Sequence, residues 1–267
     1  MPSDHVNLTQ DDALAVITLN RPEARNALSP EMLGALGRAL AFCRRPEVRA
    51  VLITGSGGAF CAGADVKDFV QYLDDGGPEA LSHHLRSLAD TLHREVILPL
   101  RRLEKPVVAG VNGVAAGAGF SLMLACDYRV AAENARFIMA YAGIGGTPDG
   151  GSTWLLPRLV GQARAMEVYF ASQPLSATRS LELGLVSQVC PSEGFGHHAL
   201  EIAQRLSQGP TAAYGKAKAL FDAAWDASLE AQLDAEAAAI SEMAQTHDFQ
   251  EGIRAFAGKR RPWFRGR

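Results

Sequence analysis

The feature that most constrains this chain is a short apolar run that ends in glycines and alanines, PVVAGVNGVAAGAGFSL at residues 106–122. Val107 to Val111 are typical of a buried strand, Asn112-Gly113 of a turn, and Ala115 to Cys126 of a helix with small side chains. Side chains this small let other groups approach the backbone closely. The stretch therefore predicts a strand, a tight turn and a helix whose backbone is open to contact.

Gly117, Ala118 and Gly119 lie near the first turn of this predicted helix. The amide N–H groups of a first turn have no partner inside the helix, and the helix dipole favours negative charge there. Such a turn can hold a developing oxyanion. The same small residues would equally allow close packing of the strand, the helix and a neighbouring chain, and the turn alone leaves both interpretations open.

Two further glycine-rich turns follow predicted strands. Gly55 to Asp65 follows a strand at Val48 to Thr54 and precedes a helical segment from Val66 toward Leu73. Gly143 to Gly151 follows predicted short strands at Tyr128 to Ala131 and Ala135 to Met139 and precedes another helix. The spacings fit neither the dinucleotide fingerprint nor a phosphate loop. A strand thus leads to a glycine-rich turn and a helix three times, which predicts an α/β fold of repeated ββα units.

The segments around these turns also have clear signals. Ala13 to Leu19 predicts a strand, and Ser29-Pro30-Glu31 predicts a helix start with Ser29 as its N-cap. Asp74 to Pro78 predicts a break and a loop, and Glu79 to Leu103 an amphipathic helix. Three histidines of this helix either line a pocket or lie on its surface: His83, His84 and His93.

The chain changes character toward its C-terminal end. After a last predicted strand at Leu185 to Val189, the sequence beyond about Pro210 is alanine-rich, with apolar residues at helical spacing. We predict a ββα core over residues 1–205 and a helical region over residues 206–267. The apolar face of that region needs a partner, either the core or another subunit, and symmetric oligomers are the usual outcome.

Composition excludes several classes of protein. The formal net charge is -3 over 267 residues, and the one basic run, at Lys259 to Arg261, is short, so no nucleic-acid footprint is present. No apolar run is long enough to span a membrane, and Met1 to Asp12 lacks a secretory pattern. The four cysteines are widely spaced, which predicts reduced thiols in a cytoplasmic protein and neither disulfides nor a zinc site.

Four motifs together resemble the enoyl-CoA hydratase/isomerase, or crotonase, family. They occur in the family's order and cover nearly the whole chain: FCAGADVKDF (60–69), NGVAAGAGFSL (112–122), ARFIMAYAGIGGTPDGGSTWLLPRLVG (135–161) and FAGKRRPWF (256–264). The resemblance implies a crotonase-type spiral of ββα units and a helical C-terminal region that assembles a homotrimer or a dimer of trimers. It also implies an acyl-CoA thioester substrate, with no metal and no cofactor other than the coenzyme A of the substrate.

The resemblance also implies roles for particular residues. The thioester oxygen is held by the amides of Ala64 and Ala118, with Gly117 beside them. Asp65 also suits the cap of the helix that follows it. The residues expected to contact coenzyme A are Ala62, Asp65, Val66, Lys67, Phe256 and Lys259.

The expected reaction depends on three positions. Typical hydratases of the family use two glutamates to activate water, and the matching positions here are Ser121 and Tyr141, which cannot act as carboxylates. Double-bond isomerases, including the ring-1,2-epoxyphenylacetyl-CoA type, place an aspartate where this chain has Asp149. We therefore expect an isomerase in which Asp149 moves one proton between the α- and γ-carbons; without the family, a helix cap near Gly150 is the simpler role.

Three other functions stay open. An enoyl-CoA hydratase could activate water through Asp149 alone. An aryl-CoA dehalogenase would pair Tyr141 and Asp149 against an aryl ring and would need one of the three histidines. A protein that binds coenzyme A without catalysis would keep the fold but exchange no substrate proton.

Overall fold

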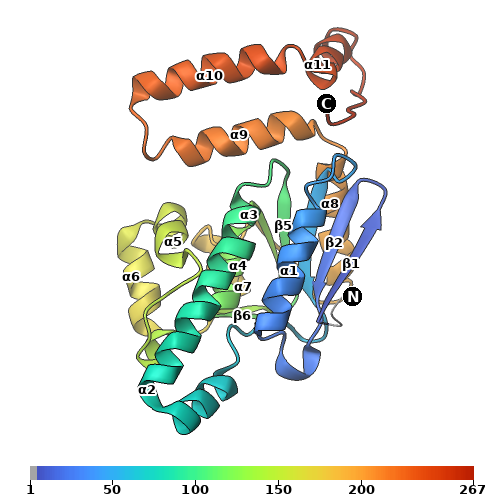
Figure 1. Cartoon of the computed structure of the whole chain (residues 1–267). Coiled ribbons are helices and arrows are strands. Elements are labelled where there is room, and N and C mark those ends of the chain that lie inside the picture. Colours follow the sequence, from blue (N-terminus) through green and yellow to red (C-terminus); the bar gives the residue numbers. More distant parts are fainter. Residues whose placement is uncertain (1–4) are drawn as a thin grey trace.

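The computed structural model describes residues 5–267 and contains two sheets (Figure 1). Six strands form the larger sheet, in the order β1-β2-β3-β5-β7-β10, and four form the smaller one, in the order β4-β6-β8-β9. Their bounds are β1 Val6–Asp11, β2 Leu14–Leu19, β3 Ala50–Gly55, β4 Ala59–Cys61, β5 Val107–Val111, β6 Val114–Ala116, β7 Tyr128–Ala132, β8 Arg136–Ile138, β9 Leu175–Ser176 and β10 Gln188–Cys190.

Helices make up most of the remaining described chain. Ser29 caps α1 as predicted, because its Oγ accepts the Met32 N–H at 3.3 Å. The bounds are η1 Pro22–Ala24, α1 Pro30–Phe42, α2 Val66–Thr91, η2 Leu92–Ile97, α3 Leu98–Arg101, α4 Ala118–Ala125, η3 Ala142–Ile144, α5 Ser152–Val160, α6 Gln162–Ala171, α7 Ala177–Glu182, α8 Phe195–Ser207, α9 Thr211–Ala223, α10 Leu229–Met243 and α11 His247–Ala257.

The predicted ββα repeat is confirmed. Three consecutive units, β3-β4-α2, β5-β6-α4 and β7-β8-α5, each place their first strand in the six-stranded sheet and their second in the four-stranded sheet. The first strands pair in parallel with one another, and so do the second strands. Stacking the units therefore builds both sheets at once, and each glycine-rich turn comes to lie beside the next.

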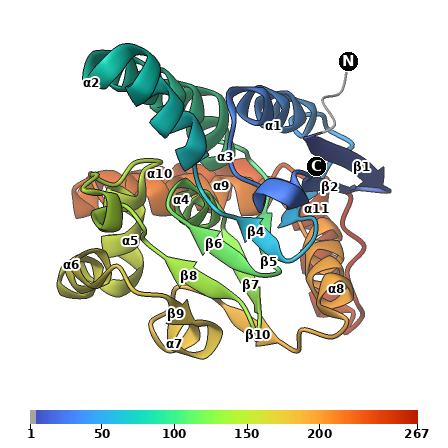
Figure 2. The ribbon, with the colours of Figure 1, turned by 90° about the horizontal axis from the view of Figure 1, so that it is seen from below.

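Alternation along the strands decides which helices cover the larger sheet. Ile53 packs into a core with Leu36 of α1, on one face of the sheet. The neighbouring residue Leu52 points the other way, into a smaller core with Ile202 of α8. Figure 2 shows the same layering, with α1 and α8 on opposite sides of the strands.

Three sequence predictions need correction, and one strand was missed. Val114 to Ala116 form strand β6, so the helix predicted from Ala115 begins only at Ala118. The loop predicted at Asp74 to Pro78 is a kink inside α2, where Gly77 has φ 69° and ψ -170°. The last strand is shifted to Gln188–Cys190, because the Leu185 N–H instead closes a turn onto the Ser180 carbonyl at 2.8 Å. Strand β1, which the sequence analysis did not predict, pairs with β2 along its whole length.

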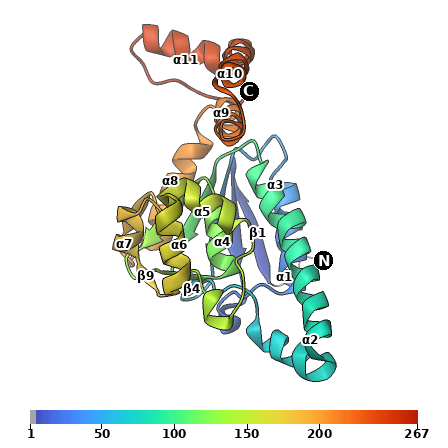
Figure 3. The same cartoon turned by 90° about the vertical axis from the view of Figure 1, so that its left-hand side faces the viewer.

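Helices α9, α10 and α11 form a layer that stands off the core (Figures 1 and 3). The predicted boundary at residue 205 falls inside α8, and the first helix of the layer begins at Thr211. Several large apolar side chains of the layer are more than half exposed: Phe221, Trp225, Leu229, Leu233, Ile240, Ile253, Phe256 and Trp263. None of the helices within residues 5–267 has the length and apolar character needed to cross a bilayer.

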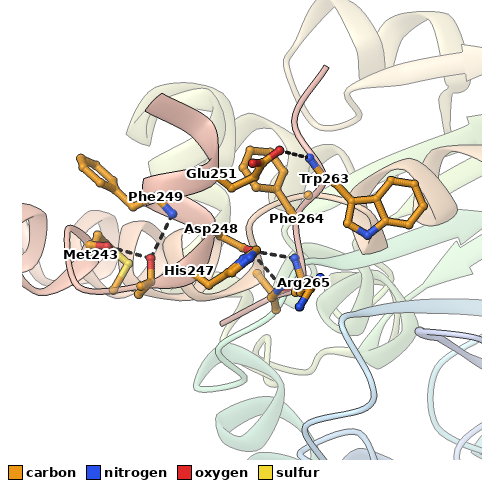
Figure 4. A network of polar contacts seen from close by, with 12 residues as sticks. Met243, His247, Asp248, Phe249, Glu251, Trp263, Phe264 and Arg265 are labelled. Carbon is orange, nitrogen blue, oxygen red and sulfur yellow. Dashed lines mark hydrogen bonds and ion pairs between the residues drawn. The ribbon is translucent and has the colours of Figure 1, made fainter. Parts of the chain in front are cut away.

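The end of the chain folds back onto α11 through two acidic side chains (Figure 4). The carboxylate of Asp248, which is only 2% exposed, accepts the backbone N–H groups of Arg265 and Gly266, each at 2.6 Å. Glu251 accepts the Trp263 N–H at 2.8 Å and forms a two-point ion pair with Arg260. Residues 260–266 are thereby held against the helix.

A cation–aromatic contact joins this layer to the core. The guanidinium carbon of Arg158, in α5, lies 3.7 Å from the ring centroid of Trp154 and 5.2 Å from that of Trp225, which follows α9. Contacts of this kind are attractive because the face of an indole ring is electron-rich. Helix α5 and the turn after α9 are therefore linked through one side chain.

Candidate functional site

Two backbone amides, those of Ala64 and Ala118, lie on touching loops. A Cβ placed on Gly63 would be 2.8 Å from the Ala116 carbonyl oxygen and 3.3 Å from the Ala118 nitrogen, so only a glycine allows this approach. Gly63 also has φ +93°, which other residues rarely adopt. Within residues 5–267, neither the Ala64 nor the Ala118 N–H donates to another group of the chain.

Ala118 is the first residue of α4, so its amide belongs to the unpaired first turn of a helix. Gly117 precedes it with φ +49°, and its own N–H is bonded to the Ile138 carbonyl at 3.0 Å. A negatively charged oxygen that accepted both free amides would also lie at the favourable end of the helix dipole. The arrangement can therefore stabilise an oxyanion.

The second half of the site is a cluster of three side chains. The Tyr141 hydroxyl donates to Asp149 Oδ1 at 2.5 Å, and the hydroxyls of Ser121 and Tyr141 are 3.0 Å apart. Burial raises the pKa of Tyr141 far above its ordinary value, and the nearby charge of Asp149 raises it further. The phenol therefore keeps its proton and acts as a donor to the carboxylate.

Helix α4 connects the two halves of the site. Ala118 opens the helix, and Ser121, one turn later, donates from its Oγ to the Asp149 carbonyl oxygen at 2.9 Å. Three residues of helix rise by about 4.5 Å. The first turn of α4 therefore contains the free amide of Ala118 and also contacts the loop that holds Asp149.

Asp149 is not the cap of α5. The residue at the cap position is Gly151, and no side chain accepts the N–H groups of that helix end. It is the backbone carbonyl of Asp149 that accepts from Ser152, from its Oγ at 2.8 Å and from its N–H at 3.1 Å. The carboxylate of Asp149 therefore accepts a hydrogen bond from Tyr141 at Oδ1, and no described residue donates to its Oδ2.

The residues expected to contact coenzyme A fall into two groups. Ala62, Asp65, Val66 and Lys67 flank Ala64, and Asp65 caps α2 as predicted, accepting the Lys67 N–H at 3.4 Å. Asp65 is also paired with Arg21 at 3.5 Å. Phe256 and Lys259 belong to the C-terminal layer, and Figures 1 and 3 place α11 at the opposite end of the molecule from the first turns of α2. One copy of the chain does not bring these two groups together.

Sequence reasoning did not single out His93. Its Nε2 accepts the N–H of Gly150, the residue after Asp149, at 3.0 Å. The other two histidines have different surroundings, because His83 is exposed and His84 stacks on Tyr72 with ring centroids 3.9 Å apart. Among the described residues no group of three or more His, Cys, Asp or Glu side chains could hold a metal ion, and all four cysteines are buried and unpaired.

Comparison with known proteins decides the family. The profile of the enoyl-CoA hydratase/isomerase family matches residues 9–267. The chain belongs to this family. The crystal structure of an enoyl-CoA hydratase from Polaromonas sp. JS666 superposes with a TM-score of 0.90 at 38% identity, over 97% of this chain and 99% of that one. The predicted crotonase fold with its helical C-terminal region is therefore confirmed.

Relatives within the enoyl-CoA hydratase/isomerase family have different reactions. A probable enoyl-CoA hydratase of Rhodobacter capsulatus is 43% identical, with 96% of each chain covered. The 1,2-epoxyphenylacetyl-CoA isomerase of Escherichia coli is 37% identical, over 96% of this chain and 97% of that one. The chain is thus an acyl-CoA enzyme of the hydratase/isomerase type, and the choice between the two reactions depends on the site.

Proposed function

We propose that this enzyme shifts a carbon–carbon double bond in an acyl-CoA thioester, with Asp149 as the single proton carrier. The observation that carries the proposal is the cluster of Ser121, Tyr141 and Asp149. The two positions at which family hydratases have glutamates hold hydroxyl groups; Tyr141 donates to the Asp149 carboxylate, Ser121 donates to the Asp149 carbonyl, and the two hydroxyl oxygens are 3.0 Å apart. One carboxylate remains where two are needed for the usual hydration.

In the proposed reaction the thioester oxygen accepts hydrogen bonds from the amides of Ala64 and Ala118. Asp149 removes a proton from the α-carbon through Oδ2, while Tyr141 holds Oδ1. The resulting dienolate keeps its negative charge on the oxygen between the two amides. Asp149 then returns the same proton to the γ-carbon, so no water and no second base are consumed.

The substrate is an acyl-CoA ester, and the coenzyme A is part of that substrate; we propose no metal and no separate cofactor. A relative named for 1,2-epoxyphenylacetyl-CoA supports substrates derived from aromatic rings beside simple enoyl-CoA esters. A cytoplasmic location stays a prediction.

Hydration of an enoyl-CoA is the second candidate, and the 43% identical relative named as a probable hydratase favours it. In that case Asp149 would activate a water molecule alone. The two candidates differ in what they do to the double bond: an isomerase moves it to another position, whereas a hydratase adds water across it and removes it.

The test compares wild type with Asp149→Asn on a 3-enoyl-CoA, whose conversion to the conjugated 2-enoyl-CoA is followed by ultraviolet absorbance. We expect isomerisation by the wild type to exceed its hydration of crotonyl-CoA. We also expect Asp149→Asn to lose at least about 100-fold in kcat, the scale of general acid–base catalysis. Binding of coenzyme A and the melting temperature serve as controls for folding.

Each other outcome selects an alternative. Dominant hydration, or a fully active Asp149→Asn variant, contradicts the proton shuttle. Binding without turnover and without exchange of the α-proton in D2O indicates a non-catalytic protein that binds coenzyme A. Activity confined to aryl-CoA halides indicates a dehalogenase.

We also propose that the enzyme works as a homotrimer or a dimer of trimers. The exposed apolar side chains of the C-terminal layer need a partner surface. In one copy, Phe256 and Lys259 are remote from the first turns of α2. Contact of these two residues with coenzyme A would require a neighbouring copy to bring its thioester site to them.

A further inference from the structure

The loop that holds Asp149 is contacted by a histidine from a distant helix. His93 is half-buried, and its Nε2 accepts the Gly150 N–H at 3.0 Å. A ring nitrogen that accepts a hydrogen bond carries no proton, so this geometry corresponds to the neutral tautomer with its hydrogen on Nδ1. Among the described residues, His93 is the acceptor of this amide.

The hydrogen bond from Gly150 to His93 adds a second constraint on the peptide unit between Asp149 and Gly150. The carbonyl of Asp149 and the N–H of Gly150 belong to the same planar group. Its carbonyl edge accepts from Ser121 at 2.9 Å and from Ser152 at 2.8 Å, and its N–H edge donates to His93. Hydrogen bonds at both edges oppose rotation of this peptide, which is bonded to the Cα from which the Asp149 side chain extends.

Packing around Gly150 leaves no room for a side chain at this position. Gly150 is buried with φ +59°, and a Cβ there would lie 2.6 Å from the Cβ of Ser121 and 3.5 Å from a methyl group of Leu92. Gly150 is therefore enclosed between Ser121 of α4 and Leu92, the residue before His93.

The local helix geometry is also unusual. Residues Leu92–Ile97 form a π-helical turn between α2 and α3, and His93 lies in it. Such a turn inserts one extra residue into a helix, and it is frequent at functional sites. The turn is thus a second feature, independent of the hydrogen bond, that sets where the imidazole lies.

We propose that His93 is a positioning residue for Asp149: it orients the peptide between Asp149 and Gly150, and so the carboxylate, without touching the substrate. The proposal rests on the proton-shuttle function of Asp149. It differs from the role that a dehalogenase would give a histidine, because the nitrogen that would take a proton from water is already an acceptor for Gly150.

The experiment compares three variants with the wild type. His93→Leu replaces the imidazole with an apolar side chain that cannot accept a hydrogen bond, His93→Gln keeps an acceptor oxygen, and His83→Leu changes an exposed histidine of the preceding helix α2 as a control. We expect His93→Leu to lower kcat on the 3-enoyl-CoA about 10- to 100-fold, the scale of a small misplacement of a catalytic group, with KM changed less than threefold. His93→Gln should recover most of this loss, and His83→Leu should stay within twofold of the wild type.

Two readouts test the proposal without relying on turnover. In the wild type, the ¹⁵N shifts of His93 should show a protonated Nδ1 and an unprotonated Nε2 at neutral pH. Amide exchange of the segment around Gly150, followed by mass spectrometry, should quicken at least tenfold in His93→Leu and recover in His93→Gln. If His93→Leu does not fold, the ¹⁵N shifts and His93→Gln still test the contact.

The outcomes separate the two proposals. A protonated Nε2, unchanged exchange in a folded His93→Leu, or full kcat in that variant of an active enzyme would overturn the role of His93. Shifts and exchange as expected in a wild type that does not isomerise would support the positioning contact and overturn the proposed reaction instead.

Discussion

Gly63 sets the spacing of the two free amides. Its α-carbon lies against the Ala116 carbonyl and the Ala118 nitrogen, at a distance that leaves no room for a side chain. Its carbonyl accepts the Leu28 N–H at 2.7 Å, which anchors the loop from the other side. The loop of Ala64 is therefore held against α4 on one side and against Leu28 on the other.

Gly63→Ala should separate the two loops. The new methyl group would lie 2.8 Å from the Ala116 oxygen, and φ +93° adds backbone strain of about 1–3 kcal/mol. We expect kcat on the 3-enoyl-CoA to fall about 100- to 1000-fold, the usual effect of losing one oxyanion donor. Initial-rate kinetics and the melting temperature measure the two effects separately.

Gly58→Ala is the matched control, because a Cβ at Gly58 meets nothing within 4 Å. It should leave kcat unchanged. Equal activity of the two variants would mean that the amide pair does not depend on this contact.

At this scale the sequence indicated much of the candidate site. Ser121, Tyr141 and Asp149 came from the family motifs, and the structure brings them together. His93 was not selected among the three histidines. Its contact joins residues 57 positions apart, and which face of a helix meets a loop is decided by packing and by the π-helical turn, neither of which leaves a local pattern.

At the scale of an element, α11 depends on the segment that folds back over it. Hydrogen bonds from Arg260 and from the Trp263 amide lower the pKa of Glu251 from 4.5 to about 2. Since the pKa is lowered in the folded state, the charged carboxylate stabilises this contact. The stabilisation is complete above about pH 4.5 and is lost as the pH falls toward 2.

Acidification between pH 4.5 and 2 should therefore break the contacts of Glu251 with Arg260 and the Trp263 amide, while the contacts of Asp248 with Arg265 and Gly266 are separate from this titration. The backbone amide resonance of Trp263, followed as the pH is lowered, should move toward its position in an unstructured chain. Glu251→Gln should remove this pH dependence, and Glu167→Gln, at an exposed position on α6, should preserve it. A Trp263 resonance that does not move before the whole protein unfolds would contradict the assignment.

Most of the longer strands were predictable from the sequence. The five- and six-residue strands of the larger sheet, apart from β1, have apolar or β-branched runs that identify them. Strands β4 and β6 have three residues each, too few for an alternation to be seen, and β6 was included in a helix. The DDGGP segment marks a true break in helical geometry, but a single glycine absorbs it, so the helix resumes at once.

At the scale of the whole molecule, the proposed assembly would divide each active site between two copies. Asp149 and the amide pair belong to the core, whereas Phe256 and Lys259 belong to the layer that stands off it (Figure 3). If the layer of one copy serves the thioester site of another, variants with different defects should complement each other.

Mixing an Asp149→Asn variant with a Phe256→Ala/Lys259→Ala variant tests this. After dissociation and reassembly of an equal mixture, about one quarter of the sites should combine an intact core with an intact layer in a cyclic trimer. Activity at low acyl-CoA concentration should rise accordingly, with native mass spectrometry to confirm mixed trimers. Asp149→Asn mixed with a variant carrying all three substitutions should recover nothing, and mixed trimers without recovered activity would contradict a shared site.

The contact of Arg158 with two indoles also gives the molecule a built-in optical probe. The chain has three tryptophans, and two of them, Trp154 and Trp225, lie against this one guanidinium from opposite sides of the boundary between core and layer. In a Trp263→Phe background, all remaining indole emission originates at that boundary. Intrinsic fluorescence would then report the docking of the C-terminal helices directly, with no added label, during folding, assembly or the binding of an acyl-CoA.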